Sequence, residues 1–129
     1  MNSDDFEFYE DDEGIAVNID LDIFNETDMQ VVYLESDSSD DKMVGDVNFM
    51  INNQDDFFKI SEREISSYIA SVYKSKDVRF KLMKIYIFPD MENEFGFLFR
   101  WVGDAEHGIG IKFSGLSVKK IGSAEVAFL

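Results

Sequence analysis

Apolar and polar residues alternate with a period of two over several stretches of the chain, and such alternation predicts β-strands. In the longest stretch, every second residue from Ile15 to Ile23 is aliphatic, and the residues between them include Asp20 and Asp22. This stretch is therefore predicted to form a strand with one buried aliphatic face, Ile23 included, and one face that carries carboxylates. Further strands are predicted at residues 5–10, 29–34, 83–88 and 116–121, and a short closing segment at 124–129.

The largest apolar face belongs to residues 95–102. Phe95, Phe97, Phe99 and Trp101 recur at a spacing of two, which places four aromatic rings on one face of a strand. A second alternating run at 109–113 follows after turn-forming residues. The two runs are predicted to form adjacent antiparallel strands at the centre of a sheet.

Between residues 46 and 75 the spacing of apolar residues becomes helical. Asp46 is a possible N-cap for a first helix. Ser61 followed by Glu64 matches a capping box, and Ile65 begins a stripe at positions i, i+3, i+4, i+7 and i+8. The sequence therefore predicts a helix over about 62–75 and a helical pair that covers one face of the sheet.

The order of these elements predicts the fold class. Strands, then helices, then strands indicate an α+β domain, with a mainly antiparallel sheet of six to seven strands and one or two helices packed on one face. The 129 residues suffice for a single domain. It would comprise an acidic β-meander (1–41), a helical segment (46–75) and C-terminal strands (80–129).

Negative charge is confined to one part of the chain. Residues 1–41 contain fifteen Asp or Glu and no Lys or Arg, whereas residues 42–129 contain twelve of each sign. The net charge of −15 therefore belongs to the N-terminal third. Such asymmetry argues against nucleic acid, which needs a basic surface, and for either a basic protein partner or merely solubility. The basic residues between 74 and 84 could instead pair with this acidic third: Lys74, Lys76, Arg79, Lys81 and Lys84.

Other classes of protein are disfavoured. The chain has no cysteine, which excludes disulfide scaffolds and cysteine nucleophiles. It has no apolar run long enough for a membrane span, and its acidic N-terminus does not resemble a secretory signal. A cytoplasmic location is the simplest expectation. No phosphate-binding loop occurs, and no cofactor is expected.

Candidate catalytic and metal-binding groups are few. The only histidine, His107, could form a site with Asp104 and Glu106, but nothing else at metal-ligand spacing accompanies it, so a structural turn is the preferred interpretation. Paired Asp20 and Asp22 could act in acid–base catalysis, although no apolar pocket is implied around them. The acidic run 37–41 could bind calcium, but it lacks the EF-hand pattern. We expect no enzymatic activity and no metal site.

The C-terminal block resembles a known type of domain. Trp101 is followed by Glu106-His107-Gly108-Ile109-Gly110-Ile111, and a glycine-led tail closes the chain. This block resembles that of a family of small acidic bacterial domains of unknown function, which are similar to immunity proteins. The resemblance implies a protein that neutralises a cognate toxin in bacterial competition, such as contact-dependent growth inhibition.

Charge and resemblance lead to the same hypothesis, an immunity protein that binds a basic bacterial toxin, most plausibly a nuclease. A nuclease must hold phosphates, so its active site is cationic and attracts an acidic inhibitor. The alternatives are a non-catalytic regulatory or structural domain and an unrecognised enzyme that uses His107. The residues predicted to contact the toxin are Glu10, Asp11, Asp12, Glu13, Asp20, Asp22, Glu35, Asp37, Asp40 and Asp41.

Overall fold

A computed structural model describes residues 6–129, except for the side chains of residues 104–107. Its strands are β1 (Phe8–Asp11), β2 (Gly14–Leu21), β3 (Glu26–Leu34), β4 (Phe80–Ile87), β5 (Glu94–Trp101), β6 (Asp104–Ser114) and β7 (Ser117–Gly122). Its α-helices are α1 (Asp41–Asn52) and α2 (Gln54–Tyr68), and a π-helical turn (Ile69–Tyr73) continues α2. Two short 3₁₀ turns are η2 (Asp22–Phe24) and η4 (Ala124–Ala127).

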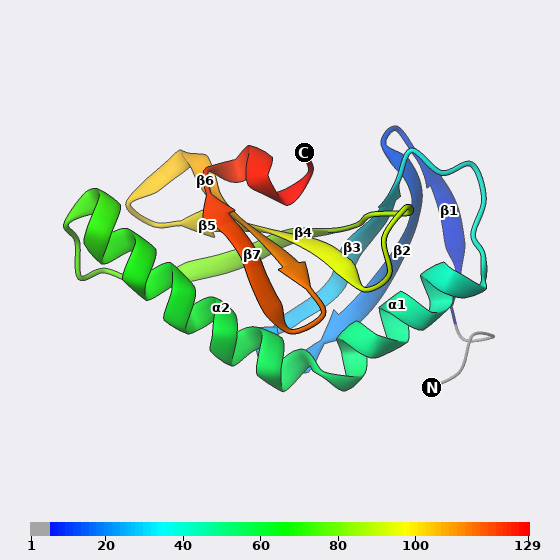
Figure 1. The fold of residues 1–129 in the computed structure, drawn as a ribbon, viewed down its shortest axis with the longest axis horizontal. Coiled ribbons are helices and arrows are strands. Elements are labelled where there is room, and N and C mark those ends of the chain that lie inside the picture. The colour runs from blue at the N-terminus through cyan, green and yellow to red at the C-terminus, as the bar shows by residue number, and fades with distance from the viewer. Residues whose placement is uncertain (1–5) are drawn as a thin grey trace.

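The seven strands form one sheet in the order in which they occur along the chain. All neighbouring strands pair antiparallel except β3 and β4, which run parallel, with Val32 opposite Tyr86. A parallel pair needs a crossover, and α1 and α2 supply it on one side of the sheet (Figure 1). The α+β prediction, with its mainly antiparallel sheet and helices on one face, is confirmed.

The aromatic face of β5 lies in the main core, as predicted. Phe95, Phe97 and Phe99 are at most 1% exposed. Phe57 of α2 enters this cluster, with its ring centroid 5.2 Å from Phe97 and 5.0 Å from Phe113. One helix residue thus contacts rings from both central strands, β5 and β6, which pair antiparallel as the sequence predicted.

The opposite side of the sheet is covered locally by η4, drawn in red in Figure 1. A Cβ atom at Gly96 would overlap the carbonyl oxygen of Ala127, and one at Gly110 would lie 2.7 Å from the Ala127 nitrogen. The two glycines therefore form a flat area on which the backbone of η4 rests. Ala127 joins a second small core cluster there with Ala16, Val32 and Tyr86.

The start of the first helix differs from the prediction. The N-cap is Asp40, whose Oδ1 accepts a hydrogen bond of 2.8 Å from the Met43 nitrogen. Asp46 lies inside α1, is 3% exposed, and forms an ion pair of 2.7 Å with Lys42. The prediction was wrong because the buried face of α1 begins at Met43, one turn before Val47.

The predicted capping box at Ser61 is also wrong. Ser61 lies in the middle of α2, fully buried, and its hydroxyl has no hydrogen-bond partner in the part of the chain that the structure describes. The buried stripe of α2 begins with Phe57, so the helix starts at Gln54 rather than at 62. The pair Asn52-Asn53 separates the two helices without a long loop.

The strand β2 ends two residues before the prediction. Leu21 is fully buried, but Asp22 begins η2, and Asn25 closes this turn in the left-handed conformation with a φ of 56°. Ile23 is therefore 42% exposed instead of buried, because the period of two no longer applies beyond the strand. Phe24 turns inward in its place and is 8% exposed.

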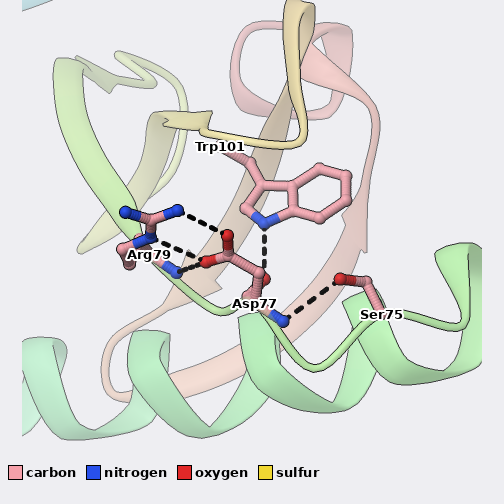
Figure 2. A network of polar contacts seen from close by, with 4 residues as sticks. All are labelled: Ser75, Asp77, Arg79 and Trp101. Atoms are coloured by element: carbon pink, nitrogen blue, oxygen red, sulfur yellow. Dashed lines mark hydrogen bonds and ion pairs between the residues drawn. The ribbon is translucent and has the colours of Figure 1, made fainter.

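Trp101 anchors the loop that follows the helices, as Figure 2 shows. Its indole Nε1 donates a hydrogen bond of 2.7 Å to the main-chain oxygen of Asp77. The Asp77 nitrogen in turn donates to the Ser75 hydroxyl, and the Asp77 carboxylate pairs with Arg79 at 2.7 Å. The tryptophan of the C-terminal block thus has a structural role in joining β5 to the segment before β4.

Candidate functional site

Two acidic segments meet at one end of the sheet. The turn between β1 and β2 carries Asp12 and Glu13, and the main-chain nitrogen of Glu35, just after β3, donates a hydrogen bond of 2.8 Å to the Glu13 oxygen. Gly14 has a φ of +150°, and a Cβ there would overlap the main-chain oxygen of Tyr33. Only glycine permits this close approach, so it fixes the distance between the two acidic segments.

Together these segments form an open depression of about 640 Å³, which we call the acidic cleft. Six of the ten predicted contact residues line it: Glu10, Asp11, Asp12, Glu13, Glu35 and Asp37. Its remaining walls are Gly14, Ile15, Leu34 and Ser36. The walls are mainly polar and charged, unlike those of typical small-molecule pockets, which are largely apolar.

Two of the six carboxylates have partners in the described part of the chain. Lys84 of β4 forms an ion pair with Glu13. Asp11 accepts a hydrogen bond of 3.1 Å from Gln30 Nε2. In the described chain the other four carboxylates have neither an ion pair nor a side-chain hydrogen bond, and all four are exposed: Glu10, Asp12, Glu35 and Asp37.

The electrostatics around Lys84 reflect this arrangement. Burial lowers the pKa of its ammonium group, but the hydrogen bond to Glu13 and the nearby charges outweigh that effect and raise the pKa above its ordinary value. Lys84 also lies over the ring of Tyr86, 5.4 Å from its centroid, and burial raises the pKa of that phenol. The Lys84 ammonium group is therefore held in its charged form by Glu13 and the nearby Asp11.

Among the described residues, pairing between the basic segment and the acidic third of the chain is confirmed for two lysines. Besides Lys84 with Glu13, Lys81 pairs with Glu26 at 3.1 Å. Arg79 instead pairs with Asp77, two residues away. The intramolecular pairs thus leave most of the acidic cleft without compensating charge.

Asp20 and Asp22 lie away from the cleft. Asp20 is seven residues along the chain from Glu13, near the other end of β2, and this corresponds to about 23 Å of strand. Its Oδ1 accepts a hydrogen bond of 3.1 Å from the Asp28 nitrogen, and Asp22 opens η2. The structure therefore does not unite these two residues with the six in the cleft.

Asp40 and Asp41 lie at the start of α1. Besides capping this helix, Asp40 lies close to the Tyr33 hydroxyl, and burial together with the Asp40 charge raises the pKa of that phenol. Tyr33 belongs to the core on the helix side of the sheet. These two carboxylates therefore serve helix α1 and do not line the cleft.

The alternative site at His107, Asp104 and Glu106 lies outside the side chains that the structure describes. For the described side chains, no group of three or more His, Asp or Glu is arranged to hold a metal ion. This includes the acidic run at residues 37–41, which was considered for calcium. None of the described helices is long and apolar enough to cross a lipid bilayer.

Sequence reasoning missed an apolar groove beside the cleft. A depression of about 270 Å³ is lined by Leu34, Glu35, Phe88, Pro89, Asp90, Met91 and Phe128, and we call it the apolar groove. It shares Leu34 and Glu35 with the acidic cleft. Its residues come from three separate segments of the chain, so periodicity could not identify it. The only sequence signal was an apolar Phe88-Pro89-x-Met91 turn at the end of a strand.

The chain was compared with known proteins. No protein-family model, no curated protein and no solved structure matches it. The resemblance of the C-terminal block to immunity-type domains therefore stays a prediction from the sequence. Within that motif, two residues have structural roles. Trp101 holds the loop before β4, and Gly110 lies against the backbone of η4.

Proposed function

We propose that this protein is an immunity-type inhibitor that binds a basic bacterial toxin through the acidic cleft, with a nuclease as the most fitting target. The observation that carries the proposal is the meeting of six carboxylates at one end of the sheet, four of them without partners in the described chain. Because these four carboxylates are not neutralised by ion pairs within the described chain, their negative charge is available to a cationic partner.

A nuclease suits this surface for a physical reason. Its active site holds phosphates and therefore presents clustered Lys and Arg side chains. An acidic cleft competes for the same charges, and electrostatic steering raises association rates by roughly 10- to 1,000-fold at low salt. The geometry narrows the proposed contact to the six cleft residues and leaves out Asp20, Asp22, Asp40 and Asp41.

The first candidate toxin for the test is any secreted protein that a neighbouring gene encodes and whose C-terminal domain is basic. Coexpression should restore growth to bacteria that this domain kills. In stopped-flow binding, the variant Asp12→Asn/Glu35→Gln/Asp37→Asn should associate about tenfold more slowly at low salt, because three unpaired carboxylates are lost. In high salt the two association rates should converge.

A matched variant removes three charges from the far end of the sheet. Asp20→Asn/Asp22→Asn/Asp28→Asn changes the net charge equally, and asparagine tolerates the positive φ of 53° at residue 28. This variant should associate at nearly the rate of the natural protein. If coexpression does not restore growth and the protein does not bind the basic domain, the proposal is wrong. If both triple variants slow association equally, the cleft is not the contact.

A further inference from the structure

We infer that the apolar groove is the anchor site of this interface and that it receives one large apolar side chain from a cationic segment of the partner. This inference deepens the proposed function and rests on it. The groove adjoins the acidic cleft through Leu34 and Glu35, so one peptide segment can occupy both. Interfaces need such anchors because charge supplies rate and specificity, whereas a few buried apolar contacts supply most of the affinity.

The size and lining of the groove fit a side chain. Its volume of about 270 Å³ lies just below the range of roughly 300–1,000 Å³ found for drug-sized ligands. Met91 is 50% exposed and Phe128 is 36% exposed, so apolar surface remains available at the rim. An indole or a branched aliphatic side chain could cover this surface.

Both walls of the groove are held in place. On one side, the Asp46 carboxylate accepts a hydrogen bond of 3.3 Å from the Asn93 nitrogen, and Lys42 donates one of 3.4 Å to the Phe88 oxygen. The connection between β4 and β5 is thereby tied to α1. A site held in its binding conformation loses less entropy when it binds, which favours affinity.

The second wall is the C-terminal segment. The Phe128 ring packs on Tyr86 with centroids 5.5 Å apart, and Lys112 donates a hydrogen bond of 2.6 Å to the main-chain oxygen of Leu129. The Lys112 ammonium group also lies 4.4 Å from the Phe88 ring centroid. This lysine therefore joins the two walls and is already engaged within the molecule.

Charge decides the kind of occupant. Glu35 and Asp90 flank the groove, and the cleft beside it holds five further carboxylates. A second copy of this chain would bring a net charge of −15 to the same surface and would be repelled. The complementary occupant is a segment in which Lys or Arg residues flank one aromatic or aliphatic residue.

The experiment uses two synthetic heptapeptides with three lysines on each side of a central residue, which is Trp in one and Ser in the other. By calorimetry at low salt, the Trp peptide should bind roughly tenfold more tightly, because one apolar side chain becomes buried. With ¹³C-methyl-labelled methionine, the indole ring should shift the NMR signal of Met91 but not that of Met83.

Two single variants test whether the tighter binding of the Trp peptide depends on the apolar groove. Met91→Ser should lower the advantage of the Trp peptide by about three- to tenfold, because part of the apolar wall is lost. Met83→Ser removes an equally accessible methionine, 44% exposed, from β4 outside the groove and should leave the advantage unchanged. The Ser peptide should bind both variants as it binds the natural protein. Phe128→Ala removes apolar surface from the opposite wall of the groove and should also lower the advantage of the Trp peptide.

Equal binding of the two peptides by the natural protein would overturn the inference, and so would an unchanged preference in both Met91→Ser and Phe128→Ala. Dimerisation that Met91→Ser abolishes would assign the groove to a second copy and would also overturn the inference.

The proposed function and the anchor site can fail separately. Toxin neutralisation without a Trp preference removes only the anchor site, whereas a Trp preference without neutralisation removes only the toxin assignment.

Discussion

At the scale of single residues, Asp77 shows how a side chain fixes a loop (Figure 2). Its carboxylate accepts hydrogen bonds from the side chain and the main-chain nitrogen of Arg79, and these lower the pKa of Asp77 from 3.8 to about 2. A carboxyl group whose pKa is lower in the folded state stabilises the fold above its unfolded pKa. This stabilisation is lost as the pH falls from about 4 toward 2.

We predict that carboxyl ¹³C NMR will show Asp77 titrating with a midpoint of about 2. Arg79→Gln should return the midpoint toward 3.8, because the charged donor is lost. Arg63→Gln is the control, since the Arg63 guanidinium lies 4.0 Å from the Glu64 carboxylate and is distant in sequence from the loop. A midpoint near 3.8 in the natural protein would contradict the pairing.

At the scale of elements, the packing of η4 on the sheet explains why glycines interrupt two central strands. Gly96 and Gly110 weaken their strands in isolation, because glycine has high conformational freedom and no side chain to pack. They stabilise the fold instead by allowing the Ala127 backbone to pack directly on the two strands. Since Phe128 directly follows η4, the position of this element also sets one wall of the apolar groove.

We predict that Gly96→Ala will lower the free energy of unfolding by about 1–3 kcal/mol, the usual cost of forcing extra atoms into a packed site. Urea unfolding measures this change. Gly45→Ala is the matched control: Gly45 lies in α1 with nothing within 4 Å of its would-be Cβ, so alanine should stabilise by up to about 1 kcal/mol. Equal stabilities for Gly96→Ala and the natural protein would mean that η4 is not seated there.

Sequence patterns predicted most elements because buried strands repeat every two residues. All seven strands correspond to predicted runs or to the strand pair at 95–113. Helix starts were wrong, since the buried faces of α1 and α2 already begin at Met43 and Phe57, and Asp40 rather than Asp46 caps α1. The parallel pairing of β3 with β4 was not predictable, because periodicity gives faces and not neighbours.

The candidate site was predictable only in part for the same reason. Charge counting identified the acidic third of the chain, but only the pairing of Gly14 with Leu34 brings Glu35 to the turn that holds Glu13. Asp20 lies on the same strand as Gly14 and points to a different region, because it is about 20 Å further along β2. Which carboxylates cluster in space thus depends on the register between β2 and β3, and the amino-acid composition does not determine that register.

At the scale of the whole molecule, the net charge of −15 acts on stability as well as on binding. Like charges repel one another in the compact state, and salt screens them: the Debye length falls from about 30 Å at 0.01 M to about 3 Å at 1 M ionic strength. The pairs of Lys84 with Glu13 and of Lys81 with Glu26 act in the opposite sense, since salt weakens attraction too. The salt dependence of stability shows which of the two effects is larger.

We predict that the melting temperature will rise between about 0.01 M and about 0.5 M NaCl, by about 4 °C for each kcal/mol of repulsion relieved. Among the described residues of the cleft, four unpaired carboxylates stand against one lysine pair, that of Lys84 with Glu13, so repulsion should dominate. Asp12→Asn/Glu35→Gln/Asp37→Asn should show a smaller rise and a higher melting temperature at low salt. Calorimetry at matched pH measures both. A melting temperature that falls with salt would mean that the lysine pairs compensate the cleft, and the cleft would then have little potential left to attract a cationic partner.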